Sequence, residues 1–192
     1  MNRREFLGTG ATFALLLVLP WKSQAATAPG SVEVVAETSR PEALAFAAAF
    51  RARGVQTRET GADASALIEE VAASLARRRT ALVGFTGTAS ALLFEAVAND
   101  RGLVLTYRGR HERAAGGSLR HVLEGDAHTV QRLASGFSHA ESAWSGAFER
   151  ELAGLVVSPR APTRVAVDLP TAGASCARGP VVSWAFAPWR DA

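Results

Sequence analysis

The chain contains 192 residues, of which 48% are hydrophobic and 20% are charged, and its formal net charge is +3. This composition excludes an intrinsically disordered chain, and the length suits a single domain. No apolar run reaches the roughly 20 residues of a membrane-spanning helix. We therefore expect one soluble α/β domain.

The first 25 residues differ from the rest of the chain. Residues 3–7 read RREFL, residues 8–19 are mostly apolar, and Lys22 precedes the small residues of SQA at 23–25. This segment resembles the twin-arginine signal peptide of exported bacterial proteins. The resemblance implies export of the folded protein to the periplasm and cleavage after Ala25. The mature protein would then have a short linker at 26–30 and one domain at 31–192.

The net charge limits what the mature chain can bind, and the cysteine content limits how it is stabilised. Removing residues 1–25 lowers the net charge to about +1, which disfavours general nucleic-acid binding because such binding depends on neutralising phosphates. Cys176 is the only cysteine, so no internal disulfide can form. Stability must come from packing.

Strand-like and helix-like segments alternate along the mature chain. Strands are expected at 32–36, 55–59, 80–84, 103–107 and 119–123, and helices over 43–50, 64–75, 89–97, 126–135 and 144–155. The tail segments 164–169 and 181–186 alternate like the strands of a terminal hairpin or edge pair. The pattern predicts a single three-layer α/β domain, flavodoxin-like or doubly wound, with a mostly parallel sheet. In alternation and size it is similar to one lobe of the two-lobed periplasmic binding proteins.

Several local signals support these elements. Ser39 and Glu42 have the spacing of a capping box, Asp126 can cap a helix, and residues 85–87 read as a turn. An apolar stripe is predicted on the third helix, formed by Ala89, Leu92, Leu93, Ala96 and Val97. Three aromatic residues near the C-terminus would cover the sheet edge or form a docking surface, namely Trp184, Phe186 and Trp189.

Two loops are the strongest candidates for a binding site. If the strand order is 2-1-3-4-5, the loops at 37–40 and 84–90 flank the crevice where open α/β sheets bind ligands. Small and hydroxylated residues before a helix offer backbone N–H groups to an anion. The alternative is a plain strand-to-helix turn with Thr88 as N-cap. The candidate ligand-binding residues are Glu37, Arg40, Gly84, Thr86, Gly87, Thr88, Ser90, Arg108 and His111.

Other chemistries have weaker signals. A hydrolase would use Ser90 or Thr86 with His111, although residues 84–88 depart from the G-x-S-x-G motif. A metal site would use residues that lack the usual ligand spacing, namely His121, Glu124, Asp126 and His128.

The leading expectation is an exported, non-catalytic α/β domain that binds a small anionic ligand or acts as an accessory to another periplasmic protein. The alternatives are the hydrolase and a partner subunit exported together with another protein.

Overall fold

The computed structural model describes residues 31–61, 63–77, 80–114, 118–140, 144, 145, 148, 163–169 and 179–188. The predicted signal peptide and linker, Cys176 and Trp189 lie outside these residues. The elements are β1 (Ser31–Glu37), α1 (Pro41–Arg51), β2 (Thr57–Thr60), α2 (Ser65–Arg77), β3 (Thr80–Gly87), α3 (Thr88–Asp100), β4 (Leu103–Arg113), β5 (Leu119–Gly125), α4 (Ala127–Ala140), β6 (Thr163–Leu169) and β7 (Val181–Pro188). None of the helices among these residues is long and apolar enough to cross a membrane.

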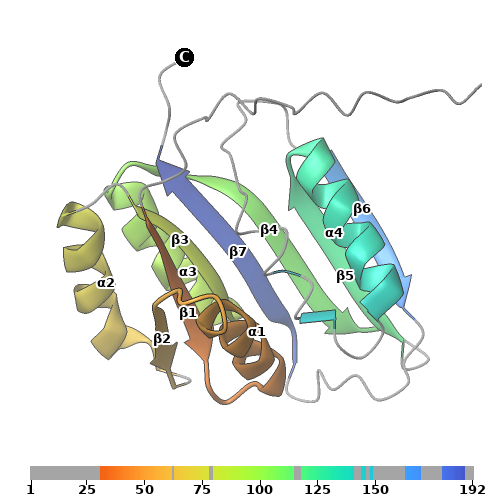
Figure 1. Ribbon diagram of the computed structural model, residues 1–192, viewed down its shortest axis with the longest axis horizontal. Helices are drawn as coiled ribbons and strands as arrows, with labels where there is room; N and C mark the ends of the chain where they lie inside the picture. Colours follow the sequence, from red (N-terminus) through yellow and green to blue (C-terminus); the bar gives the residue numbers. More distant parts are fainter. Residues whose placement is uncertain are drawn as a thin grey trace, which may run out of the picture.

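The sheet is mixed, which makes the prediction of a mostly parallel, flavodoxin-like sheet wrong. Its seven strands have the order β2-β1-β3-β7-β4-β5-β6 (Figure 1). β1 pairs in parallel with β2 and β3, whereas β3–β7, β7–β4, β4–β5 and β5–β6 are all antiparallel. The predicted C-terminal hairpin is also wrong, because β7 lies between β3 and β4 and β6 lies at the edge beyond β5. The physical reason is that residues 181–187 are all buried, and a strand covered on both faces belongs in the middle of a sheet.

Helices cover both faces of the sheet. On one side, called the α1 face, α1 and α4 pack on a core that includes Phe46, Phe85, Phe137 and Phe148. On the other side, called the α3 face, α2 and α3 pack on a second core around Trp184. Trp184 and Phe186 are each 1% exposed, so they form core and are neither an edge cover nor a docking surface.

Three local predictions are corrected by long-range contacts. β3 continues through residues 85–87 because its whole length is buried between β1 and β7. Ser39 does not cap α1, because its hydroxyl donates to Glu37 instead. Most of the apolar stripe predicted on α3 points outward, with Leu92 61% and Leu93 45% exposed, whereas Val97 packs against the core and Phe94 is buried. α3 turns this way because Phe94 stacks on Trp184.

Asp126 caps α4 as the sequence predicts. Its Oδ1 accepts hydrogen bonds from the backbone N–H groups of His128 (3.1 Å) and Thr129 (3.2 Å). We expect D126A to lower the free energy of unfolding by about 1 kcal/mol, because two N–H groups at the helix start lose their acceptor. D126N keeps the acceptor and should recover most of this loss in urea denaturation. Equal losses in both variants would contradict the capping role.

Candidate functional site

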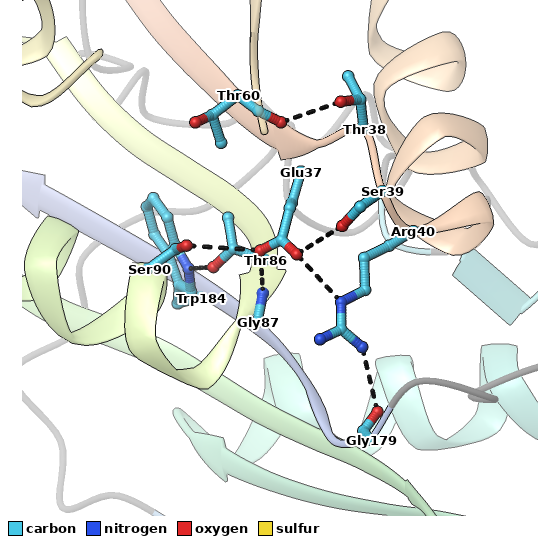
Figure 2. A network of polar contacts seen from close by, with 10 residues as sticks. All are labelled: Glu37, Thr38, Ser39, Arg40, Thr60, Thr86, Gly87, Ser90, Gly179 and Trp184. Carbon is cyan, nitrogen blue, oxygen red and sulfur yellow. Dashed lines mark hydrogen bonds and ion pairs between the residues drawn. The ribbon is translucent and has the colours of Figure 1, made fainter. Parts of the chain in front are cut away.

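Four of the predicted ligand-binding residues converge at the carboxyl ends of β1 and β3 (Figure 2). Glu37 ends β1 and Arg40 precedes α1, whereas Gly87 ends β3 and Ser90 lies in the first turn of α3. Because β1 and β3 are parallel neighbours, their carboxyl ends meet at one edge of the sheet. β2 and β3 lie on opposite sides of β1, so this is the switch point at which open α/β sheets bind ligands.

The carboxylate of Glu37 itself occupies this position. Its Oε2 accepts hydrogen bonds from the Gly87 backbone N–H (2.7 Å) and the Ser90 hydroxyl (3.4 Å). Its Oε1 accepts from the Ser39 hydroxyl (2.8 Å) and from Arg40 Nε (3.2 Å). The side chain is only 5% exposed. The donors that the sequence assigns to an anionic ligand therefore already bind a carboxylate of the chain.

Arg40 and Gly87 close the space around this carboxylate. The Arg40 guanidinium reaches from Glu37 to the carbonyl oxygen of Gly179, just before β7, at 3.2 Å (Figure 2). A Cβ atom at Gly87 would lie 3.1 Å from Glu37 Oε2 and 3.2 Å from Arg40 Nη2. The glycine thus allows the carboxylate and the guanidinium to approach the backbone closely.

The surroundings of Glu37 favour its charged form. Burial alone would raise the pKa of Glu37, but hydrogen bonds from Gly87, Ser39 and Arg40, together with the charge of Arg40, outweigh burial and lower it below the ordinary value. The N-terminus of α3 also favours a negative charge at this point. Glu37 is therefore an ionised carboxylate in the folded protein at neutral pH.

We expect E37Q to lower the free energy of unfolding at pH 7 by about 2 kcal/mol, because the amide loses the charge that Arg40 and α3 stabilise. The pKa of Glu37 in the folded protein lies below its value in the unfolded chain, which is about 4.3. The carboxylate's contribution is therefore present above that pH and is lost as the pH falls through the folded pKa. Urea denaturation at pH 7 and pH 3 should show the difference between wild type and variant shrinking in acid.

E59Q is the matched control for E37Q. Glu59 also pairs with an arginine, Arg51, but the two side chains are 39% and 46% exposed. Exposed ion pairs contribute little, so we expect a change within about 0.5 kcal/mol at either pH. An equal loss in E37Q at pH 7 and pH 3 would show that the charge of Glu37 does not stabilise the fold.

The other predicted ligand-binding residues lie elsewhere. Gly84 and Thr86 are buried beneath Trp184, whose Nε1 donates to Thr86 Oγ1 at 3.2 Å. Thr88 is exposed as the first residue of α3, and the N-cap is Gly87. Arg108 forms an ion pair with Glu95 of α3.

His111 lies on the opposite side of the sheet from Thr86 and Ser90. It stacks on Phe85, with ring centroids 5.6 Å apart and planes at 4°, and Phe85 belongs to the α1 face. Thr86 is the next residue along β3 and therefore points to the other face. Ser90 reaches Glu37 from α3 on that same side. The sheet thus separates His111 from both hydroxyl groups of the hydrolase hypothesis.

His111 belongs instead to a buried chain of polar groups that sequence reasoning misses. The Tyr107 hydroxyl lies 3.0 Å from Ser183 Oγ, which lies 2.7 Å from His111 Nε2. The Nδ1 atoms of His111 and His121 are 2.6 Å apart. A Cβ atom at Gly109 would lie 2.2 Å from the Tyr107 hydroxyl and 2.6 Å from Ser183 Oγ. Gly109 therefore makes room for the two hydroxyl groups.

One direction of hydrogen bonding satisfies this chain best. If Tyr107 donates to Ser183, Ser183 to His111 and His111 to His121, only the His121 Nε2–H lacks a partner among the described residues. The reverse direction leaves both the tyrosine hydroxyl proton and His121 Nε2 unpaired. Since unpaired buried polar groups are costly, we assign the first direction.

Burial sets the protonation states of these groups. It lowers the pKa of His121 to about 4. Burial and the neighbouring His121 lower the pKa of His111 well below its usual value. Burial also raises the pKa of Tyr107 despite the hydrogen bond with Ser183. All three side chains are therefore neutral at pH 7.

The Ser183–His111 distance matches that of a serine nucleophile and its base, but two features favour a structural role. Both residues have no exposed surface. His121, which orients His111, is neutral and so lacks the negative charge with which a carboxylate stabilises the imidazolium formed in such reactions. The chain of hydrogen bonds instead joins β4, β5 and β7 across the sheet.

The residues proposed as metal ligands do not converge. His121 is buried in the core of the α1 face, Glu124 pairs with Arg164 on the other face, and Asp126 caps α4. His128 is exposed. No group of three or more potential ligands that could hold a metal ion occurs among the described residues.

No family model, curated protein or solved structure matches this chain.

Proposed function

We propose that this chain is an exported, non-catalytic accessory protein that acts by binding another protein. The observation that carries the proposal is that Glu37 binds the donors of the predicted anion site. An incoming anion would have to displace a carboxylate held by Gly87, Ser90, Ser39 and Arg40. Separating a buried charge from its partner costs about 3–5 kcal/mol, which would weaken anion binding by two to three orders of magnitude or more.

On the α3 face, the strands that lie beyond α3 offer a surface for a partner protein. Side chains of β4, β5 and β6 form a charged area here, called the open face, that consists of Arg108, Arg110, Glu112, Arg120, Val122, Glu124, Arg164 and Ala166. Ion pairs join Arg110 to Glu112 (2.7 Å) and Arg164 to Glu124 (3.3 Å). Opposite charges in neighbouring positions favour recognition of a partner with a complementary pattern.

Native mass spectrometry of the mature protein from the periplasm of its own bacterium tests the accessory role. We expect a second polypeptide of different mass to accompany the wild type, and R110E to reduce its recovery about tenfold. R53E, on an exposed turn after α1, is the matched control and should leave recovery unchanged. Wild-type protein recovered without another polypeptide would contradict the proposal.

Binding of a small anion is the second candidate function, because four predicted residues do meet at the switch point. Acetate and phosphate are the probes, with chloride at equal ionic strength as the control. If Glu37 is a permanent occupant, neither anion raises the melting temperature of the wild type beyond chloride, whereas acetate raises that of E37A by refilling the site. A specific rise in the wild type would favour the ligand-binding function instead.

A further inference from the structure

β6 has the features of a strand edge that pairs with another chain. It is an edge strand of the sheet, and no described strand pairs with its outer side (Figure 1). β2, at the opposite edge, is only four residues long and contains the charged Arg58 and Glu59. β6 has seven residues with the uncharged sequence VAV at its centre. Long edges without central charges are templates for further pairing.

The sequence of β6 is complementary to itself when read in the antiparallel direction. It reads TRVAVDL, with Ala166 at the centre. Two antiparallel copies centred on Ala166 would place Arg164 opposite position 168 of the second copy, which is an aspartate. Val165 would lie opposite a valine at position 167, and Ala166 opposite its own equivalent. Opposite charges and paired β-branched residues at directly facing positions both stabilise antiparallel strands.

The described side chains of β6 suit this register. Val165 and Val167 are half-buried and pack against the core of the α1 face, so their pairing would continue that core from one copy to the next. Arg164 is 72% exposed, and Ala166 is exposed on the open face. The Nε atom of Arg164 lies 3.3 Å from Oε1 of Glu124. Because the Arg164 side chain is largely exposed, a second carboxylate from another copy can also reach it.

We infer that the partner of β6 is a second copy of this chain, joined about a two-fold axis at Ala166 so that one sheet runs through both copies. Such an interface is isologous, since each copy contributes the same strand. Backbone hydrogen bonds along the strand supply affinity, as in other strand-addition complexes. The opposite charges at positions 164 and 168 favour this register. The inference is independent of the accessory role proposed above.

Sedimentation of the mature protein over a range of concentrations tests the dimer and its charges. We expect a dimer whose dissociation constant rises about tenfold or more in R164D and in D168R, because each change places like charges opposite each other twice. The double variant R164D/D168R exchanges the charges and should restore dimerisation. A monomer at all concentrations, or a dimer indifferent to both single changes, would overturn the inference.

Cross-linking tests the position of the axis. In a C176S background, A166C should form a disulfide-linked dimer on mild oxidation, because position 166 faces itself across the axis. V165C is the matched control, since it faces a valine at position 167 of the second copy. Equal cross-linking in both variants, or cross-linking in V165C alone, would overturn the register. Neither result depends on whether another polypeptide accompanies the protein.

Discussion

Replacing Gly84 by alanine is expected to lower the free energy of unfolding by about 3 kcal/mol or more. The indole ring of Trp184 lies directly over Gly84, and an added Cβ would stand 2.0 Å from its Cζ2 atom. Trp184 has little freedom to move, because it is 1% exposed, donates to Thr86 and stacks on Phe94 at 5.5 Å. The methyl group must therefore displace the ring from the core of the α3 face.

The G84A experiment has a matched control and an internal check. A Cβ at Gly61 would meet nothing within 4 Å, so G61A should change the free energy of unfolding by no more than about 0.5 kcal/mol. In a W184L background, G84A should lower the free energy of unfolding by less than half of its effect in the wild type, because the clashing ring is absent. Equal costs in the two backgrounds, measured by urea denaturation, would show that contact with Trp184 is not the cause.

Acid is expected to begin destabilising the protein near pH 6.5, which is above the pH at which carboxylates take up protons. Between about pH 6.5 and pH 4 we expect a loss of about 3 kcal/mol or more from the buried His111–His121 pair. The pKa of His121 falls from the ordinary histidine value of 6.5 to about 4 in the folded protein, and that of His111 falls further in the same direction. Burial among aromatic rings disfavours the charged imidazolium in both cases.

The sign follows from proton uptake. Below pH 6.5 the unfolded chain binds protons at these histidines before the folded protein does, so unfolding is favoured as the pH falls. The stabilisation is complete above about pH 6.5 and declines down to the folded pKa. Glu37 acts in the same direction at lower pH, because its folded pKa is also lowered. The histidine effect therefore begins near pH 6.5, whereas the Glu37 effect begins only near the ordinary glutamate pKa of about 4.3.

Urea denaturation from pH 7 to pH 4.5 measures this effect. H121Q should reduce the pH dependence, because only His111 of the pair remains to take up a proton. It also lowers stability at pH 7, because His111 loses the ring of its partner. H128Q, which replaces an exposed histidine near the start of α4, is the matched control and should retain the wild-type pH dependence. A wild-type stability that stays constant over this range would contradict the assignment of a neutral, buried pair.

The sequence by itself predicts where the strands begin and how one helix is capped. Every described strand begins within two residues of its predicted start, because alternating or continuous apolar runs reflect burial of one or both faces of a strand. The predicted end of β4 is wrong, since the strand continues six residues beyond 107 to Arg113. The cap at Asp126 is also predicted, since an N-cap depends only on residues in the first turn of its own helix. The sequence places Glu37, Arg40, Gly87 and Ser90 at one site because parallel neighbouring strands bring their carboxyl ends together.

The tertiary structure alone decided the rest. β7 inserts between β3 and β4, and no local signal specifies a partner about a hundred residues away in sequence. Ser183 meets His111 only because of that insertion, although the alternation along β4 places Tyr107, Gly109 and His111 on one face. The carboxylate of Glu37 fills the position predicted for a ligand, because Gly87 and Arg40 are close enough in space to bind it. Propensity and periodicity act over a few residues, whereas strand order, the occupant of a site and the burial of a histidine pair depend on contacts between distant segments.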